Sequence, residues 1–201
     1  MASLVLNGNT SGSVTISSPA VSGTTTLTLP ASSGTVTVAG VNSNIVAGTS
    51  VASTSGTSID FTGIPSWVKR ITVMFNGFST NGSSFPQIQL GDSGGIETTG
   101  YLCGSSIILN SVGSANYTAG FTIGGSAGNW TSSRVAHGAV TITNISGNNW
   151  VAFGAFGGSD AGYTLLLGGS KTLSDVLTQV RITTVNGTDT FDAGSINILY
   201  E

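Results

Sequence analysis

Charged side chains are scarce in this sequence of 201 residues. Only 6% of the residues are Asp, Glu, Lys or Arg, against about 25% in an average soluble domain. The sequence has five Lys and Arg residues and eight Asp and Glu residues, which gives a formal net charge of -3. Nucleic acid is bound through several basic side chains on one face, and anionic membranes attract basic segments. We therefore expect neither nucleic acid nor an anionic membrane surface as a partner.

Cysteine and long apolar segments are also scarce. Cys103 is the only cysteine, so no disulfide can form within the chain. No apolar run approaches the roughly 20 residues that a membrane-spanning helix needs. Residues 1–8 carry neither a basic segment nor a long apolar one, so they do not resemble a secretion signal. We expect no membrane insertion, and synthesis in a cytoplasm without a signal peptide.

One segment is similar to a catalytic motif. Residues 91–95 read Gly-Asp-Ser-Gly-Gly, the sequence around the nucleophile of trypsin-like serine proteases. That chemistry needs a His base and a buried Asp that orients it. The only histidine, His137, follows Ser93 in the chain, whereas in those proteases the His comes first, and Ile96 replaces their Pro. We interpret residues 91–95 as a tight turn in which Asp92 and Ser93 cap backbone groups.

Other catalytic or ligand-binding patterns are weak. No second His or Cys accompanies His137, as a metal site of usual ligand count would require. The segment from Asp189 to Asp192 lacks the alternating oxygen ligands of a calcium loop, and no glycine-rich phosphate loop follows an expected strand. We predict no catalytic residue, no metal and no cofactor, and therefore a protein that is not an enzyme. A hydrolase is the least favoured alternative.

The first part of the chain differs in composition from the rest. No charged residue precedes Asp60 and no aromatic residue precedes Phe61. Alternating segments at 14–16, 26–29 and 35–38 lie between Ser, Gly and Pro, which favours short strands.

These short strands have few large side chains to bury. They also have no charged side chain to protect their edges from pairing with other strands. We expect residues 1–40 to form a β-rich arm that anchors or trimerises the protein. We expect residues 41–57, which show no strong pattern, to be a linker or a slender stalk.

Residues 58–201 have the composition of a globular head. Apolar and polar residues alternate over short segments between clusters of Gly, Asn and Ser. Strands are expected at 58–61, 70–75, 87–90, 105–109, 118–123, 135–143, 150–156, 163–167, 180–184 and 195–200. A short helix is expected at 172–177, and Asn186-Gly187 favours a type I′ hairpin turn. The pattern predicts an all-β head, a β-sandwich of jelly-roll-like form.

Aromatic residues near Asn suggest a sugar-binding or partner-binding site in the loops of the head. The candidate contact residues are Trp130, Asn129, Tyr101 and Tyr117. Trp130 stands in the sequence Gly-Asn-Trp-Thr-Ser-Ser, which is typical of a loop, and exposed loop aromatics are enriched at contacts. We interpret Trp67 and Trp150 as core residues, the usual role of tryptophan.

Several segments resemble phage proteins. Residues 8–12, 24–30 and 34–38 resemble the N-terminal arm of many small phage virion proteins. Residues 59–65, 68–73, 89–97, 179–182 and 190–200 resemble the C-terminal domains of phage tail-fibre-like proteins. The resemblance covers about half of the chain. It implies a trimeric fibre or spike with an arm that attaches to the particle and a distal β-domain that faces the host. It carries over no functional residue.

Composition and resemblance together lead to one expected function. We expect a structural virion protein of a tailed phage, a homotrimeric tail fibre or surface fibre that contributes to host attachment. Its partners would be copies of itself, other virion proteins bound through the arm, and a host surface glycan. Because the chain is short for a long tail fibre, a capsid head fibre or decoration (cement) protein without a receptor is the alternative.

Overall fold

The computed structural model describes residues 3–7, 11, 13–17, 45–126 and 130–201. The chain divides into two compact units, Met1–Asn42 and Ser43–Glu201. In the first unit, β1 (Ser3–Asn7) and β2 (Ser13–Ser17) pair in an antiparallel two-stranded sheet. β2 confirms the strand expected at 14–16. The strands expected at 26–29 and 35–38 lie outside the described residues.

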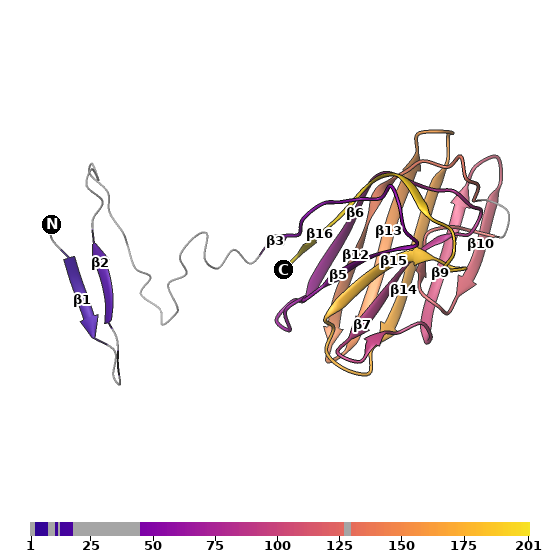
Figure 1. Cartoon of the computed structure of the whole chain (residues 1–201). Helices are drawn as coiled ribbons and strands as arrows, with labels where there is room; N and C mark the ends of the chain where they lie inside the picture. The colour runs from indigo at the N-terminus through magenta and orange to yellow at the C-terminus, as the bar shows by residue number, and fades with distance from the viewer. Residues whose placement is uncertain (1–2, 8–10, 12, 18–44, 127–129) are drawn as a thin grey trace. The chain divides into compact units, whose positions relative to one another are not determined.

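The larger unit contains two antiparallel sheets, and no helix forms among its described residues (Figure 1). One sheet has nine strands in the order β10-β9-β14-β13-β12-β6-β16-β3, and β4 also pairs with β16. Its strands are β3 (Val46–Ala47), β4 (Val51–Ala52), β6 (Arg70–Thr80), β9 (Tyr101–Ile108), β10 (Val112–Tyr117), β12 (Ala136–Ser146), β13 (Asn149–Gly158), β14 (Thr164–Thr172) and β16 (Phe191–Tyr200).

The second sheet has five strands in the order β11-β7-β15-β5, and β8 pairs with β7. Its strands are β5 (Ser58–Thr62), β7 (Pro86–Asp92), β8 (Gly95–Ile96), β11 (Phe121–Thr122) and β15 (Gln179–Thr184). The chain crosses between the sheets repeatedly, since β6 and β9 belong to the larger sheet while β7 and β8 belong to the smaller. Every strand expected in the head overlaps an observed strand, so the all-β prediction is confirmed.

The hydrophobic core is built from the inward residues of both sheets. Successive side chains of a strand point to opposite faces, and β9 accordingly alternates buried and exposed residues along most of its length. Ile71 and Val73 of β6 in the larger sheet, and Ile88 and Leu90 of β7 in the smaller, are completely buried. The two sheets therefore share one core in a sandwich-like arrangement.

The segment expected to be a linker or stalk, residues 41–57, contains two short strands of the nine-stranded sheet. β3 and β4 both pair with β16, and the Gly48 amide donates to the Ile198 carbonyl over 2.7 Å. Ser53 is fully buried, and its hydroxyl donates to the Ala193 carbonyl over 2.8 Å. The small residues of this segment, read as unpatterned in the sequence, extend the edge of the sheet.

The helix expected at 172–177 is wrong. β14 continues to Thr172, and the residues after it follow an irregular path. Leu173 and Leu177 are both buried, and their spacing of four imitates a helix. The Ser174 amide and hydroxyl both donate to the Glu97 carboxylate, over 2.7 and 2.8 Å, and this contact far away in sequence holds the segment outside a helix.

The type I′ hairpin expected at Asn186-Gly187 is also wrong. β15 and β16, which precede and follow it, belong to different sheets. A type I′ turn needs positive φ at both central residues, but no described residue other than glycine has a positive φ. The Asn186 side-chain oxygen instead accepts from the amides of Thr188 and Asp189, over 3.1 and 3.2 Å, and so caps the crossover between the sheets.

Candidate functional site

Trp130, expected in an exposed loop, is a core residue. Its side chain is only 1% exposed, and its ring stacks on Phe78 with centroids 5.6 Å apart. The indole N–H donates to the Thr80 hydroxyl over 3.0 Å, which satisfies its one polar group. The buried ring has no free face for a sugar, so the expectation of an exposed contact residue is wrong. Asn129 lies outside the described residues.

Tyr101 is also buried in the core. Its hydroxyl accepts from the Leu90 amide over 2.7 Å and donates to the Glu97 carbonyl over 3.0 Å. Its ring meets Phe121 edge to face at 5.1 Å. Burial raises the pKa of Tyr101, because the charged phenolate would lose its hydration. Tyr101 therefore joins the two sheets and offers no surface to a ligand.

Tyr117 lies at the rim of the core. Its ring is partly buried against Phe85, with centroids 6.1 Å apart, and its hydroxyl donates to the Gly125 carbonyl. Burial raises the pKa of its phenol as well. The structure thus does not bring the expected contact residues together at the surface; Trp130 and Tyr101 pack inside the sandwich and Tyr117 fastens a loop to its edge.

Sequence reasoning missed Trp67 as a surface residue. Trp150 is buried as expected, but Trp67 is 50% exposed. The Val68 amide donates to the Pro65 carbonyl over 3.1 Å, so Trp67 stands at the third position of a β-turn. Pro65-Ser66 is the sequence signal that could have placed Trp67 in this turn.

One face of the nine-stranded sheet points away from the five-stranded sheet, and a large part of this outer face carries no charged residue. Two neighbouring cross-strand rows run over it from β10 to β16. The first row is Asn116, Gly104, Gly168, Phe153, Thr141, Thr72 and Leu199; the second is Ser114, Ser106, Leu166, Ala155, Ala139, Met74 and Asn197. Neither row contains a charged residue, and every member is at least partly exposed. We call these two rows the uncharged face.

Large apolar side chains project from the outer face. Phe153 is 63% exposed and Leu166 is 44% exposed, and both belong to the uncharged face. Leu102, 72% exposed, follows along β9 next to the first row. Solvated faces of antiparallel sheets usually carry polar residues. Exposed apolar residues that gather on one face are enriched where proteins contact other molecules.

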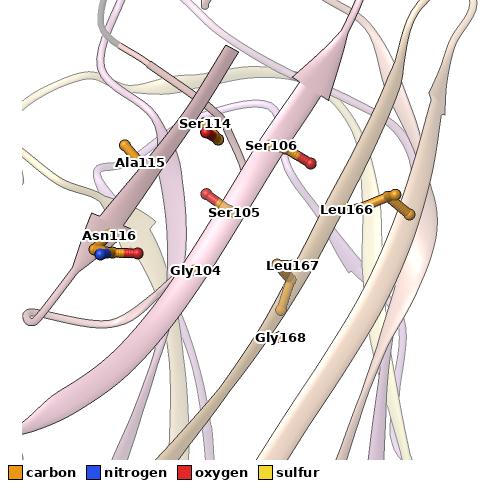
Figure 2. A pocket seen from close by; sticks show the side chains of 9 residues that line it. All are labelled: Gly104, Ser105, Ser106, Ser114, Ala115, Asn116, Leu166, Leu167 and Gly168. Carbon is orange, nitrogen blue, oxygen red and sulfur yellow. The ribbon is translucent and has the colours of Figure 1, made fainter. Parts of the chain in front are cut away.

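The uncharged face is hollowed where β9 meets β14. Gly104 and Gly168 are directly paired, so two neighbouring positions have no side chain. Figure 2 shows this pair among the side chains of Ser106, Ser114, Asn116 and Leu166. The depression measures about 430 Å³. Its hydroxyl and amide groups can hydrogen-bond a neighbouring chain, while the adjoining Phe153 and Leu166 offer apolar contact.

The protease-like segment forms the expected tight turn. β7 and β8 pair through Asp92 and Gly95, and the Asp92 carboxylate accepts from the Gly94 amide over 2.8 Å. His137 lies on β12 in the other sheet, where its Nε2 is 3.1 Å from Ser159 Oγ. The Gly77 amide donates to His137 Nδ1 over 3.0 Å. The neutral ring therefore carries its proton on Nε2 and donates it to Ser159, so it is not positioned as a base for that hydroxyl.

One polar cluster joins the two sheets. Lys171 of β14 is buried and forms an ion pair with Glu97, which follows β8. The Ser174 hydroxyl lies between the two carboxylates, 2.7 Å from Asp92 and 2.8 Å from Glu97. Hydrogen bonds from Ser174 and from the Gly94 amide lower the pKa of Asp92.

The same cluster also favours the ionised form of the Glu97 carboxylate. Burial opposes its ionisation, but the Lys171 ammonium and the hydrogen bonds from Ser174 outweigh burial and lower its pKa. The oxygen atoms of the cluster are thus occupied by internal partners, and its evident role is to hold the sheets together.

Within residues 3–7, 11, 13–17, 45–126 and 130–201, no three His, Cys, Asp or Glu side chains gather in a group that could hold a metal ion. No helix in this part of the chain is long and apolar enough to cross a membrane. No protein-family model, curated protein or solved structure matches the chain.

Proposed function

We propose that this protein is a structural virion protein of a tailed phage, a homotrimeric tail fibre or surface fibre that contributes to host attachment. The resemblance of its segments to phage virion proteins suggested this function. The observation that carries the structural part of the proposal is the uncharged face, because a sheet surface without charge and with exposed Phe153 and Leu166 favours permanent contact with another chain.

A second copy of the same chain is the occupant that we propose for the uncharged face. In a homotrimer each uncharged face meets those of its two neighbours around the threefold axis without placing like charges together, and no charged side chain within the rows has to be desolvated. The two rows cross seven strands, about 4.8 Å apart, and take about four residues along each at about 3.4 Å, so they cover roughly 460 Å², a little over half of one partner's share in a standard interface. Each partner in a standard protein interface contributes roughly 800 Å².

The edge of the nine-stranded sheet supports the same proposal. β10 pairs with β9 on one side only and ends the strand order. Its residues, Val112–Tyr117, include no charge, and Val112 is 70% exposed. Natural proteins usually protect such edges with charged residues or proline. A neighbouring subunit would cover this edge together with the uncharged face.

The remaining parts of the proposal concern the particle. The arm, residues 1–40, anchors the protein to other virion proteins or trimerises it, and the head presents a jelly-roll-like sandwich to the host. The protein works without catalytic residues or cofactors and is located in the virion. A sandwich with one face for contact with other subunits suits this role, because it leaves the loops at its ends free for contact with the host.

Immunogold electron microscopy of phage particles tests the proposed location. Antibodies against the full chain are expected to label a tail or surface fibre. Label spread over the capsid shell would favour the alternative, a decoration protein without a receptor. Intact particles without label, from cells that make the protein, would contradict a virion function of either kind.

The arm is tested by incorporation into particles. Deletion of residues 1–40 is expected to abolish incorporation and to leave a soluble head, because the arm and the head divide into separate compact units. Particles that incorporate the truncated chain at the normal level would show that the arm is not the attachment segment.

A further inference from the structure

Trp67 lies beside a depression at one end of β6, β12 and β16. The depression measures about 510 Å³ and is lined by Trp67, Lys69, Arg70, Thr143 and Glu201. Small-molecule sites commonly measure about 300–1,000 Å³ and combine apolar rings with a few polar groups. The depression therefore has the size and the mixed lining of a ligand site.

The indole of Trp67 is exposed but held in place. Trp67 is 50% exposed, whereas Trp130 and Trp150 are 1% and 4% exposed. The ring of Tyr200 supports it from one side, with centroids 6.0 Å apart and planes tilted by 50°. The turn from Pro65 to Val68 fixes the backbone beneath it. An oriented aromatic ring that remains open to solvent is suited to stack on a flat apolar surface.

Positive charge gathers beside this ring. Four of the five basic residues form ion pairs: Arg70 with Glu201, Arg134 with Asp160, Lys171 with Glu97 and Arg181 with Asp60. Lys69 forms no ion pair with any described residue and is exposed. The Arg70 side chain next to it remains 56% exposed despite its ion pair. In a protein of net charge -3, this corner holds two neighbouring cations, one of them uncompensated.

We propose that the depression binds an acidic sugar unit, a hexose with a carboxylate or phosphate group, within a host surface glycan. This assignment rests on the proposed role in host attachment. The Trp67 indole stacks on the C–H face of the sugar ring. The Lys69 ammonium pairs with the anionic group, and the Thr143 hydroxyl and the Glu201 carboxylate hydrogen-bond the ring hydroxyls.

Each group of the site selects against another class of ligand. A neutral sugar leaves Lys69 without a counter-charge, and a simple anion leaves the indole exposed. The Arg70–Glu201 ion pair keeps an acceptor for hydroxyl donors in the same site as the cations, and that acceptor repels an acidic peptide with several carboxylates.

Titration of the full chain with single sugars tests the proposal. The probes are D-glucuronate, D-glucose 6-phosphate, D-glucose, inorganic phosphate and a hexaglutamate peptide, and binding is measured by calorimetry and by tryptophan fluorescence. We expect an acidic sugar to bind at least about tenfold more tightly than glucose, because a hydrogen bond to a charged group exceeds a neutral one by this amount. The two acidic sugars distinguish carboxylate from phosphate as the preferred anion.

Variants assign the binding to these residues. Lys69→Ala is expected to lower the affinity for the acidic sugar about tenfold and to leave glucose unchanged, and Lys69→Arg to restore most of it. Trp67→Ala is expected to abolish binding of both, and Trp67→Phe to retain part of it. Val176→Ala, an exposed apolar residue outside the site, is the matched control. The native mass of each variant is expected to equal that of the wild type.

The outcomes separate this inference from the proposed function. Binding that survives Trp67→Ala, or equal binding of glucose and glucuronate, overturns the site. If inorganic phosphate or hexaglutamate binds more tightly than the acidic sugars, the sugar assignment is overturned. If Trp67→Ala has a lower native mass than the wild type, Trp67 belongs to a subunit interface instead. Absence of sugar binding in a protein that labels phage fibres refutes only the inference, whereas sugar binding by a protein absent from particles refutes only the virion function.

Discussion

The two faces of the nine-stranded sheet are made by the same strands but meet different surroundings. On the inner face, Phe156 is 2% exposed and packs against Phe75 with centroids 5.2 Å apart. On the outer face, Phe153 of the same strand is 63% exposed. The inner face is covered by the five-stranded sheet of its own chain. The uncharged face on this outer side carries exposed apolar side chains among small polar ones and lacks charge, but this chain's described residues leave it uncovered.

The difference shows what alternation along a strand does and does not decide. Period-two alternation places every second residue on the core side, and it normally places charge on the other side. Here Ser, Thr, Gly and Ala take the place of charge, so the second face is compatible with contact to another chain. Burial of a face therefore depends on the partner available, and we propose that the outer face obtains its partner by self-association.

Substitution of Phe156 and Phe153 on β13 tests the comparison of the two faces, and it is expected to give the largest difference in stability. Phe156→Ala is expected to lower the free energy of unfolding by about 3–5 kcal/mol, because it leaves a cavity between the sheets. Phe153→Ala is expected to cost less than about 1 kcal/mol in the isolated subunit. Urea unfolding measures both. If the stability lost in Phe153→Ala grows with protein concentration, the outer face contacts a second copy of the chain. A large loss of stability that does not depend on concentration would contradict the comparison of the two faces.

Gly168 and Gly169 on β14 also test the comparison of the two faces, and a moderate difference in stability is expected. A Cβ atom at Gly169 would lie 2.4 Å from the Leu102 carbonyl oxygen, whereas one at Gly168 would meet nothing nearer than 3.9 Å. Gly169→Ala is expected to destabilise the fold by about 1–3 kcal/mol, since backbone must move. Gly168→Ala is expected to change stability by less than about 1 kcal/mol. Thermal unfolding followed by circular dichroism compares them, and equal melting temperatures would contradict this account.

The polar cluster between the sheets makes the inner contact sensitive to acid. Interactions with Ser174 and Lys171 lower the pKa values of Asp92 and Glu97 below their ordinary values of 3.8 and 4.5. Their contribution is therefore complete above these ordinary values and is lost as the pH falls through the lower values of the folded state.

Urea unfolding over a pH series measures this loss. The wild type is expected to lose stability in the acid range, and Glu97→Gln to lose less with falling pH, because one of the two linked carboxyls is gone. Asp192→Asn, which removes an exposed acid, serves as the control. A Glu97→Gln profile that parallels the wild type would refute the role of this carboxylate.

The smallest effects are expected at the protease-like residues. Ser93 is exposed in the β7–β8 turn, and His137 is exposed on the other sheet. Ser93→Ala is expected to change the free energy of unfolding by no more than about 0.5 kcal/mol, and neither Ser93→Ala nor His137→Ala to alter any measured activity. Hydrolysis of a peptide or glycan substrate that either substitution abolishes would revive the hydrolase alternative.

Strand positions could be predicted from the sequence where apolar residues alternate. β10 was missed because Gly, Ser, Ala and Asn fill its middle and leave no hydrophobic period. The helix at 172–177 was predicted from local sequence alone, but the contact of Ser174 with Glu97, far away in sequence, decides the backbone there. The sequence also could not predict which strands belong to which sheet, because the turn signal at Asn186-Gly187 does not indicate which sheet the next strand joins.

The candidate site was harder to predict than the fold. Trp130 has the sequence surroundings of a loop, yet Phe78, 52 positions earlier, supplies the ring that buries it. Trp67 was interpreted as a core residue from the usual role of tryptophan, yet its turn position exposes it. The uncharged face depends on the register of strands across the whole sheet, which composition suggested only as a general lack of charge.

The native mass in solution tests self-association through the uncharged face most directly. Light scattering on a sizing column is expected to give the wild-type chain three times its mass of 20.0 kDa. Leu166→Lys places a charge on the uncharged face and is expected to shift the protein toward the monomer. Val176→Lys, at a residue equally 44% exposed but off that face, is expected to leave the trimer intact. A wild-type monomer at every concentration, or a Leu166→Lys variant that remains a full trimer, would contradict the account.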